Sequence, residues 1–402
     1  MRIAILYPHN PSPARTGSHS RLLSIASSLR NAGHSLLLLS STYGTDQRWN
    51  SSSRNALVRN GLFERVAVYE NFLFERIRQR TVARLFPPQH LPAPASRLQR
   101  RWVATQLQAF RPDAVLVNYA MLAGWLPSGI HGSLPTIMEM HDFVSVNAVL
   151  RESVQHWLKA DAERAPSLRD AQWFDAAVAS RHDPIPMPWE VTCYSKFTLT
   201  IAISPVDAET LHRASSGCRV EVVQHSPSRE LRRSDHSGLP LLVGSDNPFN
   251  TQGAIVFRDA ILPLILESDP SFRFHVMGAV SSLFQTCEQA IPLGYVKQPE
   301  DDVFPKARLL IAPTFSGTGQ QTKVLDCMAA GIPAVLFSDA AARLQLDDQK
   351  NALVADTVQS FAEACLVLQH DAPLLARLGN NALHHVARLR NIDYSTIVSS
   401  IA

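Results

Sequence analysis

The sequence predicts a doubly wound α/β fold made of two domains, each built on a parallel β-sheet. Short apolar runs rich in β-branched residues alternate with helical stretches, beginning with RIAILYP (2–8), a helix over 21–33 and SLLLLSS (35–41). The same alternation starts again at LPLLVGS (239–245) and continues to PAVLFS (333–338). At 402 residues, the chain is also long for a single hydrophobic core.

Each element of the first domain follows from its local pattern. RIAILYP has the continuous apolar character of a strand that is buried on both faces. The Pro, Gly and Ser residues of 9–20 predict a loop, and the helix that follows ends at Gly33. Later apolar runs predict further strands at 114–118, 136–140, 199–204 and 220–224.

The polar segment SPSRELRRSDHSG (226–238) is typical of an inter-domain linker. We therefore place the first domain at 1–228 and the second at 236–385, and we expect a terminal helix over 386–402 to pack back toward the first domain. The second domain is predicted to contain a helix at 253–268 and, in order, strands at 239–245, 272–278, 291–295, 308–314 and 333–338.

The composition excludes several classes of protein. Hydrophobic residues make up 46% of the chain and charged residues 18%, as in an ordinary globular protein. A net charge of +3 is too small to favour nucleic acid as a partner. The five cysteines form no CxxC pair, which fits a reducing compartment. Because no apolar stretch approaches about 18 residues and the apolar start is too short for a signal peptide, we expect a cytoplasmic protein.

An irregular block over 43–110 interrupts the pattern of the first domain. Seven arginines and no acidic residue lie between Arg76 and Arg101. One interpretation is a solvated, partly helical insertion. The other is a basic patch that faces a phosphorylated acceptor or an anionic membrane, where each arginine adds about 1 kcal/mol of binding free energy.

Three loops between a strand and a helix are candidates for the functional site, because ligands of doubly wound folds bind beyond the carboxyl ends of the strands. They are RTGSHS (15–20), GSDNPFN (244–250) and FSGTGQQTKVLDCMAAGIP (315–333). Glycine in such loops lets backbone amides approach an anion. In the third loop, Lys323 lies one helical turn before Asp326, which suits a diphosphate and a ribose but also an ordinary surface ion pair.

The third loop and its surroundings resemble the donor-site signature of glycosyltransferase family 4. In that family a glycine-rich loop leads into a K-V-L-E-A-M-A-x-G-x-P-V-V pattern, to which GTGQQTKVLDCMAAGIPAVLFS is similar. Gly244, Asn250 and Gly278 match the opening of the family's C-terminal domain, and IPLGYV (291–296) is similar to its base-binding strand end. In the N-terminal half, GSHSRLLSIASSLRNAGHSLLLLS, TIMEMHDFVS and LTIAISPVDAETL resemble family segments.

The resemblance implies a GT-B fold, in which two Rossmann-like domains with parallel sheets face each other across a cleft. The second domain would bind a nucleotide-sugar donor and the first an acceptor. The implied activity moves a hexosyl or deoxyhexosyl group to an acceptor hydroxyl with retention, in the biosynthesis of a glycan, a lipopolysaccharide or a glycolipid. No metal and no other cofactor is implied.

The resemblance also implies roles for individual residues. His141, Asp142 and Lys323 are the expected catalytic residues, His19 and Asp142 are expected to contact the acceptor, and Glu139 and Glu190 are expected to be structural. Donor binding is expected at Gly17, Ser18, Gly244, Ser245, Asn250, Tyr295, Val296, Gly317, Thr318, Gly319, Lys323 and Asp326.

Two departures from the family pattern leave alternatives open. Thr318 stands where the first glutamate of the family's E-x7-E pair falls, and Asp326 stands at the second, ribose-binding position. The loop 244–250 lacks the Arg and Lys of many members, so Lys323 is the expected source of positive charge for the diphosphate. The alternatives are a nucleotide-sugar-binding protein of little or no activity, and a GT-B epimerase or inverting transferase.

Overall fold

The computed structural model of the chain describes residues 1–14, 16–42, 48–72, 74, 75, 77, 81, 95–164, 185–227, 231–390 and 394–401. The chain forms two compact units. The first unit comprises Met1–Ala148, Ile185–Gln224 and Ile392–Ala402, and the second comprises Val149–Pro184 and His225–Asn391.

The first unit is built on a seven-stranded sheet in the order β3-β2-β1-β4-β5-β6-β7. All neighbouring strands are parallel. The order reverses between β1 and β4, so the carboxyl ends of these two strands mark the expected ligand crevice of this sheet. The strands are β1 (Arg2–Leu6), β2 (Ser35–Ser41), β3 (Arg65–Tyr69), β4 (Ala114–Asn118), β5 (Thr136–Met140), β6 (Leu199–Ala202) and β7 (Val220–Val222).

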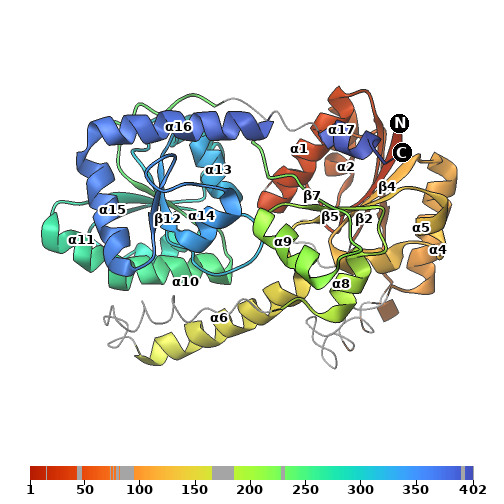
Figure 1. Cartoon of the computed structure of the whole chain (residues 1–402), viewed down its shortest axis with the longest axis horizontal. Coiled ribbons are helices and arrows are strands. Elements are labelled where there is room, and N and C mark those ends of the chain that lie inside the picture. The colour runs from red at the N-terminus through yellow and green to blue at the C-terminus, as the bar shows by residue number, and fades with distance from the viewer. Residues whose placement is uncertain are drawn as a thin grey trace. The chain divides into compact units, whose positions relative to one another are not determined.

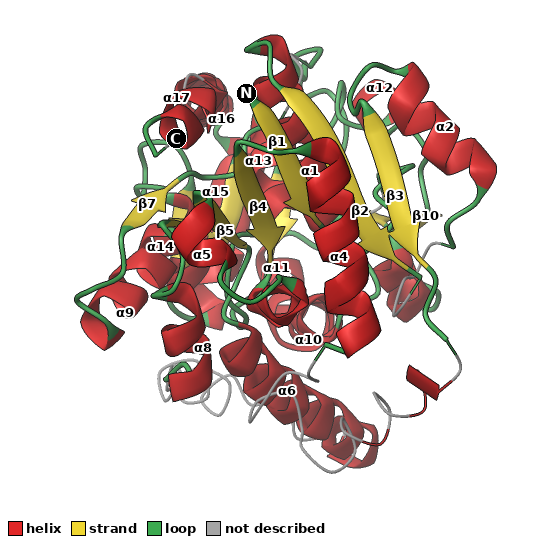
Figure 2. Cartoon of the chain, turned by 90° about the vertical axis from the view of Figure 1, so that its right-hand side faces the viewer, coloured by secondary structure: helices red, strands yellow, loops and turns green. Residues whose placement is uncertain are grey.

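Helices pack against this sheet and close its core. The apolar face of α1, formed by Leu22, Ile25 and Leu29, is buried against the strands, and α4 contacts both β1 and β3 (Figure 2). The helical elements of this part are α1 (Gly17–Asn31), α2 (Ser51–Arg59), α4 (Arg97–Phe110), η1 (Ala120–Trp125), α5 (Ile130–Ser133), α6 (Val144–Arg164), α8 (Pro188–Tyr194), α9 (Pro205–Ala214) and α17 (Tyr394–Ser399).

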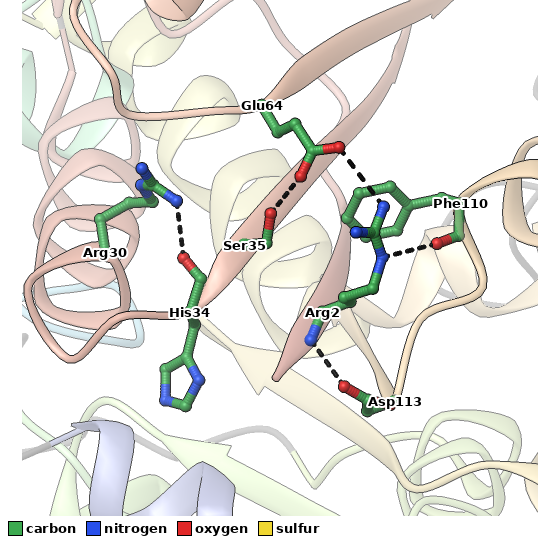
Figure 3. Close-up of polar contacts among 7 residues, drawn as sticks. All are labelled: Arg2, Arg30, His34, Ser35, Glu64, Phe110 and Asp113. Atoms are coloured by element: carbon green, nitrogen blue, oxygen red, sulfur yellow. Dashed lines mark hydrogen bonds and ion pairs between the residues drawn. The ribbon is translucent and has the colours of Figure 1, made fainter.

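Polar contacts fasten the amino ends of the strands in the first unit (Figure 3). The backbone N–H of Arg2 donates to Asp113 Oδ2 at 2.7 Å, and the Arg2 Nε–H donates to the Phe110 carbonyl at 2.8 Å. Ser35 donates a hydrogen bond to Glu64, which lowers the pKa of this carboxyl. These contacts lie at the amino ends of the strands, whereas the candidate loop of this unit follows the carboxyl end of β1. We therefore interpret them as structural.

The second unit is built on a six-stranded parallel sheet in the order β10-β9-β8-β11-β12-β13. Its order reverses between β8 and β11, and the loops after these two strands are 244–247, where the structure ends the predicted loop 244–250 at the start of a helix, and 313–321. The strands are β8 (Leu241–Val243), β9 (Phe274–Met277), β10 (Ala290–Gly294), β11 (Leu310–Ala312), β12 (Ala334–Phe337) and β13 (Leu353–Ala355). Two parallel sheets with interspersed helices confirm the α/β prediction.

The helix predicted over 253–268 is longer and contains a wide turn. α10 (Pro248–Val256) passes through a π-helical turn, η3 (Phe257–Ile261), into α11 (Leu262–Ser268). The wide turn precedes Pro263, whose ring cannot donate the usual backbone hydrogen bond. The remaining helices are η4 (Ala279–Phe284), α12 (Pro299–Asp302), α13 (Thr322–Met328), α14 (Ser338–Leu344), α15 (Val358–His370) and α16 (Ala372–Arg390).

The unit boundaries differ in detail from the predicted domains. The central segment of the first unit ends at Gln224, and not at the predicted residue 228. In addition, α6 begins in the first unit and continues into the second. The predicted boundary at residue 385 falls inside α16, and α17 alone belongs to the first unit, where it contacts α1 (Figure 1).

Most of the arginine-rich block lies outside the described residues, including Arg76 and Arg84. Arg97, Arg100 and Arg101 are described, and all three are exposed on α4. Within the described ranges, every helix is too short or too polar to cross a membrane.

Candidate functional site

Two glycines shape the strand ends beside the candidate site of the second unit. Gly278 follows β9 with φ +91°, and a Cβ atom there would lie 2.3 Å from the carbonyl oxygen of Gly244. At Gly244, which follows β8, a Cβ atom would lie 2.7 Å from a methyl carbon of Val280. Both positions therefore require glycine, and their close approach fixes the start of the loop 244–250.

The loop between β11 and α13 contains two glycines in left-handed conformations, Gly317 with φ +115° and Gly319 with φ +74°. A Cβ atom at Gly317 would lie 3.5 Å from the ring of Phe249, which belongs to the first turn of α10. Between the glycines, the Thr318 hydroxyl is buried without a hydrogen-bond partner among the described residues. A buried polar atom without a partner indicates a place where a ligand or water binds.

Lys323 forms hydrogen bonds to residues that follow two different strands, β8 and β11. From the first turn of α13, its Nζ donates to Asn250 Oδ1 at 2.7 Å and to Thr314 Oγ1 at 3.3 Å. Asn250 in turn donates to Ser245 Oγ at 3.0 Å. The side chain is half-buried, which lowers the pKa of Lys323 to about 8, and no described carboxylate pairs with its charge. A desolvated cation with neutral partners favours the binding of an anion.

The other predicted donor residues of the second unit lie at the same edge of the sheet. Asp326 follows Lys323 by one turn, its side chain is 37% exposed, and its Oδ1 lies 3.6 Å from Nε2 of the buried His225. Tyr295, which is 74% exposed, and Val296 follow β10, two strands from β8.

In the first unit, His141 follows β5 and lies beside the end of β4. Its Nε2 is 2.9 Å from Asn118 Oδ1, and its ring stacks on Tyr119 with centroids 4.3 Å apart. Asn118 is itself fixed because its amide donates to the Leu6 carbonyl at 3.0 Å. The imidazole is therefore held in one orientation at the point where the strand order reverses. Asp142 accepts a hydrogen bond from Asn147 Nδ2 at 2.9 Å.

The residues predicted in the loop 15–20 lie in the first turn of α1, and their surroundings differ. Gly17 begins the helix, and Ser18 Oγ accepts a hydrogen bond from the Tyr7 hydroxyl at 3.2 Å. His19 is only 3% exposed and packs edge-on against Tyr7 and His9. Its contact with an acceptor stays a prediction, and its surroundings are aromatic.

Glu190 and Glu139, the two carboxylates expected to be structural, both have protein partners. Glu190 accepts hydrogen bonds from the backbone of Val144 at 2.6 Å and of Ser145 at 2.9 Å, which caps the start of α6. Glu139 is fully buried, which raises its pKa, although Arg21 lies beside it at 2.8 Å.

Sequence reasoning missed three residues of these clusters. Thr314 and Asn118 are polar residues at or just after the end of a buried strand, and this position is a usable signal. His225 lies in a loop without periodicity, so the sequence contains no signal for its approach to Asp326. No group of three or more His, Cys, Asp or Glu side chains in the described part of the chain could hold a metal ion.

Comparison with solved structures shows the same fold at low sequence identity. Sucrose-phosphate synthase from Thermosynechococcus elongatus aligns with a TM-score of 0.67 and 13% identity over 99% of this chain and 97% of that chain. HepE of Anabaena, solved with UDP and glucose, aligns with a TM-score of 0.63 and 14% identity over 100% and 98%. A variant of TarM from S. aureus, solved with Fondaparinux, alpha-GlcNAc-glycerol and UDP, gives 0.65 and 10% over 99% and 98%.

The two parallel sheets and these similarities show that the chain has the fold of the GT-B class, which the resemblance implied. Residues 239–371 match the family described as Glycosyl transferases group 1, so this part of the chain is a glycosyltransferase domain. The match covers β8 to β13 and both donor-site loops. No curated protein sequence gives a significant match to the chain.

Proposed function

We propose that the protein transfers a sugar from a nucleotide-sugar donor to a hydroxyl acceptor, with the donor bound by the second unit. The observation that carries this proposal is Lys323, a half-buried cation that has only neutral partners among the described residues and lies between the segments that follow β8 and β11. The solved complexes of HepE with UDP and glucose and of TarM with UDP support a uridine nucleotide as the first donor to test.

The chemistry assigned to the second unit is electrostatic. Negative charge develops on the diphosphate as the glycosidic bond breaks, and a fixed cation stabilises it without the help of a metal ion. Lys323 supplies this charge, and the free hydroxyl of Thr318 and the backbone of Gly317 and Gly319 supply hydrogen bonds. Asp326 accepts hydrogen bonds from the ribose hydroxyls.

The proposal for the first unit concerns the acceptor and the transferred sugar. His141, held by Asn118, contacts the sugar, and Asp142 binds the acceptor hydroxyl. Gly17 and Ser18 contribute donor contacts, and transfer proceeds with retention as in the family that the sequence resembles. The anomeric configuration of the product, measured by NMR coupling constants, tests retention, and an inverted product would point to an inverting transferase.

Nucleotide binding is the first test of the proposed function. A ligand present at about 100 times its dissociation constant adds about 2.7 kcal/mol to the stability of the folded protein, so thermal unfolding should shift upward with UDP or a UDP-sugar. GDP and dTDP compounds form the comparison set, followed by turnover assays with the donor that binds. Absence of any shift would contradict the proposal.

A second candidate function is a nucleotide-sugar-binding protein without catalysis. Thr318 favours it, because a hydroxyl does not replace the charge of the carboxylate that many family members place there. Tight binding of a donor combined with no transfer and no hydrolysis, on any acceptor tested, would establish this function instead.

The affinity for UDP should fall above about pH 8. Lys323 has a pKa of about 8 without ligand, and a bound diphosphate raises this pKa because the opposite charge favours the protonated form. Binding therefore takes up a proton above about pH 8, and the affinity falls by up to about tenfold per pH unit there. Calorimetry in two buffers of different ionisation enthalpy measures the uptake, and an affinity that is constant from about pH 7 to 9 would contradict it.

We also propose that the protein contacts the anionic inner face of a membrane through the region Arg76–Arg101. In its described part, Arg97, Arg100 and Arg101 are exposed on α4, which has no acidic residue, and Leu98 is 44% exposed beside them. Glutamine at the three arginines should reduce cosedimentation with phosphatidylserine vesicles. Binding that does not depend on the anionic lipid content would contradict this contact.

A further inference from the structure

His225 is a buried titratable residue that the proposed chemistry leaves unused. It is the first residue of the second unit after β7, it is 1% exposed, and neither of its ring nitrogens has a hydrogen-bond partner among the described residues. Burying an imidazole without partners costs free energy. Such an arrangement needs a reason in the function of the molecule.

Among the described residues, Asp326 places a carboxylate close to the ring. The distance from His225 Nε2 to Asp326 Oδ1 is 3.6 Å, which is slightly too long for a hydrogen bond. The whole side chain of His225 is 2% exposed, and that of Asp326 is 37% exposed. Asp326 therefore has a protein donor within reach on one side and solvent on the other, and a small rotation of its side chain would close the gap.

The backbone of His225 is fastened to the same loop. Its N–H donates to Gln320 Oε1 at 2.9 Å, and the Gln320 amide donates to the Arg343 carbonyl at 3.1 Å. Gln320 directly follows Gly319 of the donor-site loop. The position of the imidazole is consequently fixed relative to both the loop and α13.

We propose that His225 is a positioning residue of the donor site, which orients Asp326 for the ribose. A carboxylate is only an acceptor, and its two oxygens can be shared between two kinds of donor. In the bound state, one oxygen accepts from His225 Nε2–H and the other from the ribose hydroxyls. Fixing the carboxylate in this way reduces the entropy that binding must remove. The inference rests on the proposed function, which assigns Asp326 to the ribose.

Two amide substitutions form a matched test. The glutamine amide nitrogen reaches the position of the histidine Nε2, whereas the asparagine amide nitrogen reaches only that of Nδ1. His225→Asn should weaken UDP binding about tenfold or more, because it removes a hydrogen bond to a charged group. His225→Gln should restore most of the lost affinity. Calorimetry gives the affinities, and thermal unfolding without ligand shows whether both variants are folded.

A UDP analogue without the 2′ and 3′ hydroxyls separates positioning from a general structural effect. His225→Asn should not weaken the analogue, because the analogue has no hydroxyls for Asp326 to accept from. Equal losses for UDP and the analogue, or a glutamine variant no better than the asparagine variant, would overturn the inference while leaving nucleotide binding intact. A wild-type protein that binds none of UDP, GDP and dTDP would instead overturn the proposed function itself.

Discussion

Replacing Lys323 by alanine should lower turnover at least about 100-fold, because it removes the electrostatic stabiliser of the leaving diphosphate. The side chain contacts Asn250 and Thr314, both neutral, so the lost charge has no described substitute within this cluster. Steady-state kinetics with the donor identified by binding would measure the loss. Near-unchanged turnover would remove Lys323 from the site.

Two further variants control this experiment. Lys323→Met keeps most of the apolar stem and removes only the charge, so it should lose nearly as much turnover as alanine if charge is the cause. Lys350→Ala removes the same charge from an exposed lysine that pairs with Asp347, and it should leave turnover close to the wild-type value. A methionine variant with normal turnover would assign the effect of alanine to packing.

Replacing Arg21 by leucine should destabilise the first unit by about 3–5 kcal/mol, because the fully buried Glu139 would lose its cationic partner. The Arg21 guanidinium is 3% exposed, donates to Glu139 at 2.9 Å and also donates to the Gln224 carbonyl at 2.7 Å. Among the described residues, the Tyr394 hydroxyl, at 2.7 Å, would be the remaining donor to the carboxylate. Urea unfolding would measure the change in the free energy of unfolding.

An exposed ion pair provides the comparison. Arg213 and Glu209 pair on the surface of α9 with side chains 73% and 64% exposed, and Arg213→Ala should cost less than about 0.5 kcal/mol. Adding Glu139→Leu to Arg21→Leu should recover part of the stability, because the isolated charge is then removed. A loss below about 1 kcal/mol for Arg21→Leu would show that the buried pair contributes little.

The fold could be predicted because buried parallel strands and amphipathic helices have distinct local patterns. The runs that became β1 and β12 are almost entirely apolar, and the alternation of such runs with helical stretches is typical of parallel sheets. The π-helical turn before Pro263 could not be predicted, because a proline within a helical pattern is compatible with a kink, an end or a wide turn.

From residue spacing alone, the sequence could bring together only those residues of the candidate site that are close along the chain, and the resemblance to a family supplied the others. Lys323 and Asp326 are one helical turn apart on α13, so the local sequence pattern was enough to predict that they lie close together. The contact of Lys323 with Asn250 and that of His225 with Asp326 join residues 73 and 101 positions apart (323 − 250 and 326 − 225). Such pairs depend on the tertiary fold, and a single sequence contains no pattern that specifies them.

The buried pair of Arg21 and Glu139 has a consequence for synthesis of the chain on the ribosome. A further donor to Glu139 is the hydroxyl of Tyr394, which belongs to α17 and is translated after all of the second unit. Domains generally fold in the order in which they emerge. In this chain, most of the first unit emerges early, but its buried carboxylate, Glu139, gains the hydrogen bond from Tyr394 only after α17 has been synthesised. A chain arrested before residue 394 would therefore lack the Tyr394 hydrogen bond to Glu139 in its first unit.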